Sequence, residues 1–169
     1  MLFPLTTVYA KQHHLDGIII FIGVNDLSGS QSQSQSLVAV AEGSDVMTAT
    51  TTTAVSHILE NVDSVIKESL KRIPNNNILL VSPCNINPRN LSKFALNHGY
   101  GSSGCLSGLK TLEVEYEKLA QKRNIHFLSL LHVVSPECYI DGVHLSKSGY
   151  EQIATAISDK IQQSKIFIT

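Results

Sequence analysis

Two short motifs hold the residues of this chain whose types and spacing suit chemistry. The first is Gly23-Val24-Asn25-Asp26, directly after the apolar run 18–22, and the second is Asp141-Gly142-Val143-His144. Asn25 has a side-chain amide that can donate a hydrogen bond to a developing oxyanion. His144 supplies an imidazole, and Asp141 a carboxylate near enough in sequence to orient that ring. The two motifs together predict part of a hydrolase site in which no nucleophile is evident.

A histidine that acts as a general base needs its Nδ1 proton held by an acceptor, so that the Nε2 lone pair faces the nucleophile. A tight loop through Gly142 would let Asp141 provide that acceptor. The alternative for this motif is an Asx turn at Asp141 and a surface histidine near a helix start. The first motif has an alternative too, because Gly-x-Asn-Asp suits a turn after any strand, with Asp26 as a capping or loop-fixing residue.

Two serines and one glycine-rich segment are the candidates for the chemistry that the two motifs lack. Ser44 follows a glycine and precedes an aspartate, and it is the candidate nucleophile, although the order is not Gly-Asp-Ser. Ser28 lies near the expected site, but nothing in the sequence activates it. The segment 99–104 matches G-x-G-x-x-G but follows no predicted strand, so it predicts a mobile loop and no dinucleotide site.

Composition excludes several classes of partner. The chain has 169 residues, a formal net charge of -1 and 16% charged residues, which predicts one domain without a nucleic-acid-binding face. Its basic residues alternate with acidic ones along predicted helices, as expected of solvated helix faces. The three cysteines show no zinc or disulfide spacing and are predicted to be free thiols. No signal peptide or membrane-spanning stretch is evident, so the default location is cytoplasmic.

Hydrophobic periodicity predicts the elements that position the two motifs. Apolar runs at 18–22, 78–81 and 125–130 predict strands, the first of them covered on both faces. Helical spacing over 55–73, 109–119 and 150–161 predicts three helices. The first is predicted to stop at 74–77 and the second at Asn124. The third is predicted to begin with a Ser148–Glu151 capping box. Residues 28–36 predict a flexible loop. The alternation predicts a three-layer α/β/α sandwich with a parallel sheet, and both motifs fall at the carboxyl ends of its strands, where such folds bind ligands.

With both motifs in this order, the chain resembles the SGNH hydrolases, the GDSL-like lipase and esterase family. The family's third block, G-x-N-D, is matched by residues 23–26, and its fifth block, D-x-x-H, by residues 141–144. The resemblance implies the flavodoxin-like SGNH fold and a serine ester hydrolase, such as a carboxylesterase, acetylesterase or lipase. It makes His144 the base, Asp141 its orienting acid and Asn25 an oxyanion-hole donor. A small ester or acylated carbohydrate would be the substrate, and neither a cofactor nor a metal is implied.

The chain departs from the family pattern at its N-terminal side. The Gly-Asp-Ser block and the second block, together with the first two strands of the fold, have no counterpart. We therefore expect a single SGNH hydrolase-like domain over 1–169 that is incomplete at the N-terminus, with an exposed sheet edge at 18–22 able to self-associate. Two other hypotheses remain: a noncatalytic or degenerate binding domain, and a metal site at Asp26, Asp141 and His144, whose spacing has no specific signature.

Overall fold

The computed structural model describes residues 15–28 and 44–167, without the side chains of residues 44–50. Three short apolar segments form a parallel sheet in the order β1-β2-β3. They are β1 (Ile18–Phe21), β2 (Ile78–Val81) and β3 (His126–Leu128). Ile18 pairs with Ile78, and Leu79 pairs with His126. Each strand is shorter than the apolar run that predicted it, except β2, which has the predicted bounds.

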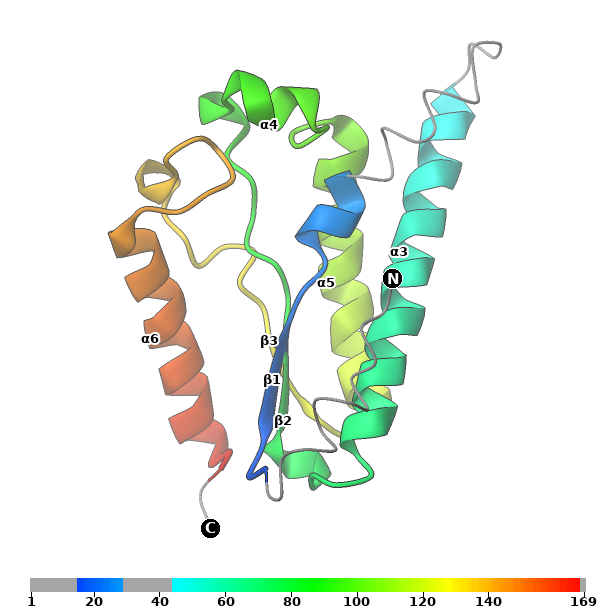
Figure 1. Cartoon of the computed structure of the whole chain (residues 1–169), viewed down its shortest axis with the longest axis vertical. Coiled ribbons are helices and arrows are strands. Elements are labelled where there is room, and N and C mark those ends of the chain that lie inside the picture. Colours follow the sequence, from blue (N-terminus) through cyan, green and yellow to red (C-terminus); the bar gives the residue numbers. More distant parts are fainter. Residues whose placement is uncertain (1–14, 29–43, 168–169) are drawn as a thin grey trace.

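Helices cover the two faces of this sheet (Figure 1). On one side lie α3 (Ser44–Ser69) and α5 (Ser103–Arg123), and on the other lies α6 (Lys147–Ser164). The short elements are residues 24–28, which are helical, α4 (Lys93–Asn97), and the 3-10 turns η1 (Asn75–Asn77), η2 (Pro88–Asn90) and η3 (Pro136–Cys138). All four residues of β2 are buried because it lies between the other strands and under both helix layers. The predicted α/β fold with a parallel sheet is confirmed.

The core is divided by the sheet into two clusters. Ile20, Ile78 and Leu80 pack with the inner faces of α3 and α5, whereas Leu79 and Val81 pack on the side of α6. Alternate residues of a strand point to opposite faces, so β2 contributes to both clusters. The helix layer of α3 and α5 is further joined by Arg123, whose guanidinium donates to both carboxylate oxygens of Asp63 at 2.6 and 2.8 Å. These bonds hold the pKa of Asp63 at about 2.

The ends of the helices match the sequence prediction at α5 and differ from it at α3 and α6. Helix α3 ends at Ser69, before the predicted stop at residues 74–77. Asn124 caps α5 in the left-handed conformation, at φ 52°, where asparagine is tolerated. The predicted capping box at Ser148 and Glu151 is wrong, because the N-cap of α6 is Ser146, whose hydroxyl accepts from the Gly149 N–H at 3.4 Å. The Ser148 hydroxyl instead lies 2.8 Å from that of Ser146. Ser146 and Ser148 lie two residues apart, and either could cap the helix. The backbone conformation before α6 selects Ser146.

The prediction that the first strand is covered on both faces is also wrong. Ile20 is buried toward α3 and α5, but Ile19 and Phe21 on the opposite face are 40% and 42% exposed. Their register partners Leu79 and Val81 on β2 are fully buried. The layer formed by α6 therefore covers β2 and leaves β1 open. Within the described sheet β1 is an edge strand, and Figure 1 shows it in front of β2 and β3.

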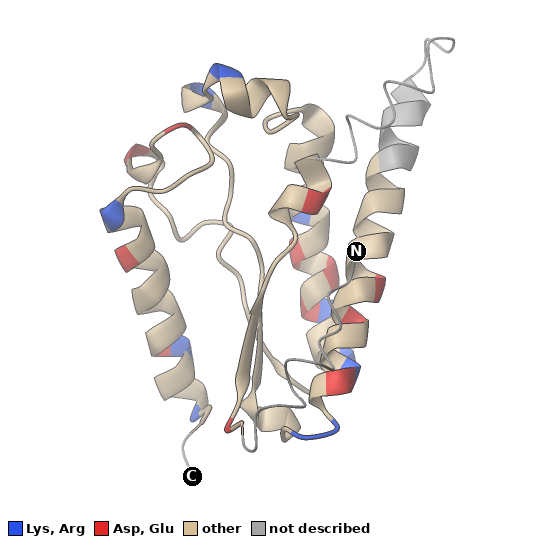
Figure 2. Cartoon of the chain, viewed as in Figure 1, with Lys and Arg blue, Asp and Glu red and all other residues tan. Residues whose placement is uncertain are grey.

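Charged residues of both signs are spread over the elements in the view of Figure 2. Both basic and acidic residues occur on α3, α5 and α6. The pairs Lys71–Glu68, at the end of α3, and Lys118–Glu115, on α5, place opposite charges three residues apart at the surface, where they contribute little to stability. None of the described helices is long and apolar enough to cross a membrane.

Candidate active site

The second motif forms a tight loop in which Asp141 and His144 are hydrogen bonded. The His144 Nδ1 lies 2.8 Å from one carboxylate oxygen of Asp141. The other oxygen accepts from the backbone N–H groups of His144, at 2.7 Å, and Val143, at 3.0 Å. These two backbone bonds are those of an Asx turn. The turn and the ring contact, which were alternatives in the sequence, therefore occur together, with one oxygen for each.

The electrostatics of this pair determine which ring nitrogen holds the proton. Hydrogen bonds from the His144 ring, from the His144 backbone N–H and from the Val143 N–H lower the pKa of Asp141 to about 2. The carboxylate is thus ionised near neutral pH and can only accept, so Nδ1 must be the donor. In the neutral ring Nε2 then has the free lone pair. The His144 side chain is 65% exposed and that of Asp141 is 23% exposed, so the ring is accessible to a reactant.

Residues 85–92, which follow β2, hold this loop in place. Gly142 has a φ of +86°, and a Cβ there would lie 2.8 Å from the Asn87 carbonyl oxygen and 2.9 Å from Leu91. The Asn87 N–H donates to the Gly142 carbonyl at 2.8 Å, and the side-chain amide of Asn90 donates to the Tyr139 carbonyl at 3.0 Å. Only glycine fits position 142, because it combines a positive φ with close backbone contact.

The first motif leaves β1 through Gly23, which has a φ of +122°. A Cβ at Gly23 would lie 2.9 Å from Leu112 and 3.1 Å from the Tyr116 hydroxyl, both on α5. The same hydroxyl donates to the Ile22 carbonyl at 3.2 Å, and burial raises the pKa of Tyr116 well above its usual value. The exit of β1 is therefore fixed by α5. Asn25 follows in the helical residues 24–28, with its side-chain oxygen 2.7 Å from the Tyr100 hydroxyl.

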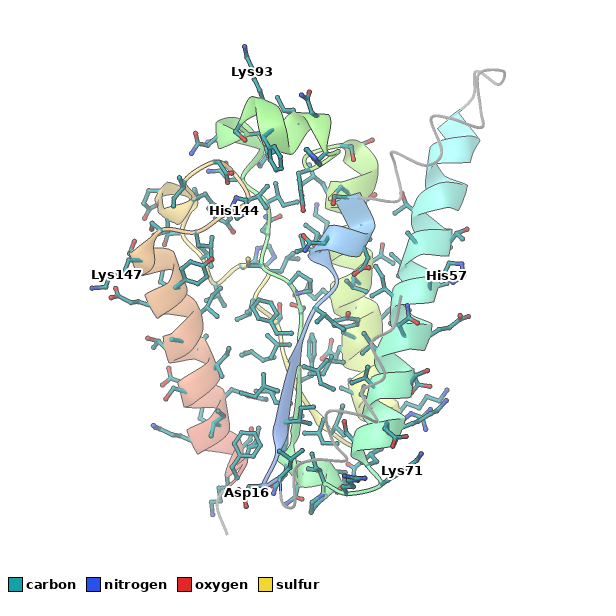
Figure 3. All side chains as sticks on the ribbon, viewed as in Figure 1. Asp16, His57, Lys71, Lys93, His144 and Lys147 are labelled. Carbon is teal, nitrogen blue, oxygen red and sulfur yellow. The ribbon has the colours of Figure 1, made fainter. Side chains whose placement is uncertain are left out.

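Both motifs lie at the same end of the sheet, beyond the carboxyl ends of the strands. Val24 of the first motif and Val143 of the second pack against the same hydrophobic cluster, the one on the side of α3 and α5. Figure 3 shows His144 at this end, between α4 and the start of α6. Among the described residues, no hydrogen bond joins Asn25 and His144 directly.

Two buried serines at this end of the sheet are hydrogen bonded to groups other than His144. Ser28 is buried and its hydroxyl donates to the Asn25 carbonyl at 2.9 Å. Ser82, also buried, accepts from the Leu130 N–H at 3.0 Å. Within residues 15–28 and 51–167, no serine hydroxyl is hydrogen bonded to His144. Ser44 is the first residue of α3, and its side chain lies outside the described residues. The flexible loop predicted for residues 28–36 falls outside them as well, apart from Ser28.

The segment 99–104, for which a mobile loop was predicted, forms a tight turn after α4 and continues into the first residues of α5. Gly99 and Gly101 have φ values of 78° and 86°, and the Tyr100 N–H donates to the Ala95 carbonyl of α4 at 3.1 Å. Tyr100, Asn87, Asn90 and Leu91 were not predicted from the sequence to contribute to the site. Two features of the sequence could have indicated these residues: the concentration of asparagine over 85–90, and a Gly-x-Gly turn that encloses an aromatic residue.

The hypothesis of a metal site at Asp26, Asp141 and His144 receives no support from the arrangement. Asp26 is exposed in the helical residues 24–28, and its negative charge contributes to raising the pKa of Tyr116. Across the described part of the chain, no three His, Cys, Asp or Glu side chains are grouped so that they could hold a metal ion. The described cysteines, Cys84, Cys105 and Cys138, are unpaired.

Comparisons with known proteins bear on the family and the fold of the chain. The model of the family described as GDSL-like lipase/acylhydrolase matches residues 5–157, which confirms the resemblance drawn from the two motifs. The fold is similar to that in the crystal structure of a carbohydrate acetylesterase family member from Sinorhizobium meliloti. The TM-score is 0.62 and the identity 20%, over 95% of this chain and 67% of that chain. No curated protein matches the chain.

Proposed function

The chain belongs to the GDSL-like lipase/acylhydrolase family, and on that premise we propose that it contributes the base and an oxyanion donor of a serine ester hydrolase. The observation that supports this most directly is the 2.8 Å contact between His144 Nδ1 and an Asp141 carboxylate oxygen. It leaves an exposed Nε2 free to accept a proton. Asn25 lies at the same end of the sheet and has its amide nitrogen available to a ligand.

In the proposed reaction each residue has one role. The Nε2 atom of His144 takes the proton of an attacking hydroxyl as the new C–O bond forms, and Asp141 stabilises the resulting imidazolium. The Asn25 amide donates to the carbonyl oxygen as it becomes an oxyanion. Collapse of the tetrahedral intermediate breaks the ester C–O bond, and His144 returns its proton to the leaving alcohol. A water molecule then repeats the sequence on the acyl-enzyme and regenerates the hydroxyl.

The hydroxyl in this scheme is assigned to a serine, and Ser44 remains the candidate. Ser28 is excluded from that role by its burial and by its bond to the Asn25 carbonyl. For the substrate we propose a small acyl ester of an alcohol or a carbohydrate. The similarity to the fold of a carbohydrate acetylesterase family member supports the carbohydrate part. The match to the GDSL-like lipase/acylhydrolase family supports the acyl ester.

One observation favours a second candidate function, a noncatalytic binding domain with the same fold. No serine hydroxyl among the described residues is hydrogen bonded to His144, and a base without a nucleophile retains little of a triad's rate advantage. Such a domain would keep the exposed imidazole and amide as polar contacts for an ester- or sugar-like ligand. The two functions differ in whether any serine of the chain becomes covalently modified.

A serine-directed fluorophosphonate probe separates the two functions. Labelling of one serine, located by peptide mass spectrometry and lost in a His144→Ala variant, is the expected result. His132→Ala is the matched control, because His132 is also an exposed histidine but lies in the loop after β3, outside the two motifs. Absence of labelling at high probe concentration would support the binding domain. Labelling at Ser44 would confirm that candidate, and labelling elsewhere would replace it.

Turnover of p-nitrophenyl acetate tests the role of Asn25. Removing a side-chain oxyanion donor typically lowers kcat by about 10² to 10³, so Asn25→Ala should reduce turnover by that factor with little change in KM. A variant with unchanged kcat would remove Asn25 from the mechanism, whatever the probe shows for serine.

A further inference from the structure

Tyr100 lies outside the two motifs and is hydrogen bonded to Asn25 of the first motif. The Tyr100 hydroxyl donates to the side-chain oxygen of Asn25 at 2.7 Å, across 75 residues of sequence. We propose that Tyr100 is a positioning residue that turns the Asn25 amide so that its nitrogen, and not its oxygen, faces the substrate. This inference rests on the proposed function, because the orientation matters only if the Asn25 amide donates to an oxyanion.

The chemistry of an amide makes this orientation consequential. An asparagine side chain has one oxygen that only accepts and one nitrogen that only donates, and the two groups are similar in size. Without a fixed partner, either group can face a ligand. A hydroxyl that donates to the oxygen selects one of the two orientations and leaves both N–H groups for other acceptors. Presenting the oxygen instead would repel a developing oxyanion, so holding the correct orientation removes a rearrangement from the reaction.

The turn that presents Tyr100 is fixed on both sides. It begins at the end of α4, where the Gly99 and Tyr100 N–H groups donate to carbonyls of α4 at 3.0 and 3.1 Å. It ends at Ser102, which caps α5 by accepting from the Cys105 N–H at 3.1 Å. The Tyr100 side chain also packs against the hydrophobic cluster on the side of α3 and α5. A side chain held in this way loses little further freedom when it makes its hydrogen bond.

The same turn contacts the segment that supports His144. A Cβ at Gly101 would lie 2.2 Å from Leu91, and a Cβ at Gly142 would lie 2.9 Å from another atom of Leu91. Leu91 therefore lies between the turn that holds Asn25 through Tyr100 and the loop that contains Asp141 and His144. The glycine-rich segment 99–104 thus positions an amide donor, a role that its G-x-G-x-x-G spacing does not suggest.

Nuclear magnetic resonance of the side-chain amide tests the inference without activity. The Asn25 NH₂ signals are assigned by their loss in Asn25→Asp. Tyr100→Phe keeps the aromatic ring and removes the hydroxyl, and we expect it to displace the Asn25 pair. The matched control, Tyr150→Phe, alters an exposed tyrosine of α6 and should leave the pair in place. An unchanged Asn25 pair in Tyr100→Phe would overturn the proposal.

Proton exchange in the same samples tests the orientation itself. With the oxygen facing Tyr100, both Asn25 amide protons are open to water and exchange rapidly. Protection of one of them that disappears in Tyr100→Phe would overturn the proposal, because it would place the nitrogen against the tyrosine. Thermal unfolding followed by circular dichroism confirms that each variant is folded before these signals are compared.

A double-mutant cycle on p-nitrophenyl acetate turnover links the orientation to the reaction. Tyr100→Phe should lower kcat by about 2- to 10-fold, the value of one hydrogen bond, and the loss should disappear in an Asn25→Ala background. An equal loss in both backgrounds would overturn the inference. Absence of turnover in the unaltered protein would refute the proposed function instead, and the amide signals would still decide whether Tyr100 orients Asn25.

Discussion

Replacing Asp141 with asparagine should move a proton from one nitrogen of the His144 ring to the other. In the native loop one carboxylate oxygen accepts two backbone N–H groups, and the other accepts the ring N–H. An asparagine keeps one oxygen, and the two backbone donors would retain it. Its NH₂ group would then face Nδ1, which must accept, so the neutral ring would hold its proton on Nε2. His144 would be present and correctly placed but unable to act as a base.

The cost in stability follows from the carboxyl group. Lowering the pKa of Asp141 from 3.8 to about 2 corresponds to at most about 2 kcal/mol of stability. Solvent around the exposed ring reduces this to about 1 kcal/mol. Because the folded pKa is the lower one, this stability is present above about pH 4 and is lost as the pH falls through about 2. Asp141→Asn should therefore be less stable than the native protein at pH 7, with the difference shrinking in acid.

The tautomer is read from long-range ¹H–¹⁵N correlations of the histidine rings at mildly alkaline pH, where an imidazole is neutral. The chain has seven histidines, and His144 is assigned by loss of its signals in His144→Gln. Asp159→Asn, an exposed change on α6, is the matched control and should leave the His144 pattern unchanged. A native ring with its proton on Nε2, or an Asp141→Asn ring with its proton still on Nδ1, would refute the reasoning. In an active enzyme, the corresponding change in a serine triad lowers kcat by about 10⁴.

Three further predictions concern the scaffold around the site. Gly23→Ala should destabilise the protein by about 1 to 3 kcal/mol in urea unfolding. The reason is that φ is +122° and the new Cβ would lie 2.9 Å from Leu112. An unchanged unfolding midpoint would show that the exit of β1 relaxes freely. Asp63→Asn should lower Tm at pH 7 and have a smaller effect on Tm near pH 2, because the native carboxylate has a pKa of about 2 and gains its proton there. An equal loss of Tm at both pH values would contradict an ionic origin of the stabilisation. We also propose that the open edge of β1 permits self-association, so Phe21→Lys should reduce concentration-dependent sedimentation while Phe94→Lys, on α4, should not. A monomer at all concentrations in the native protein would refute that proposal.

Features set by short stretches of sequence were predictable. The four apolar residues 78–81 became β2 with the predicted bounds, because an uninterrupted run of β-favouring residues suits a strand that is buried on both faces. Asn124 ended α5 as expected, since few other residues tolerate the left-handed cap. The spacing of Asp141 and His144, with a glycine between them, was enough to suggest that the carboxylate meets the ring. Each of these features was indicated by the residue types within a few positions of the chain.

Features that depend on packing between distant segments were decided only by the tertiary structure. Ile19 and Phe21 are apolar and β-favouring, as Leu79 and Val81 are. Only Leu79 and Val81 are covered, because α6 lies over β2 and does not extend over β1. Tyr100 contacts Asn25 across 75 residues, and the distance along the chain carries no information about that contact. The sequence by itself determined the strands, the principal helices and the local loop of His144. The tertiary structure determined which side chains orient and surround the two motifs, because those contacts arise only when separate helices and loops are packed on one sheet.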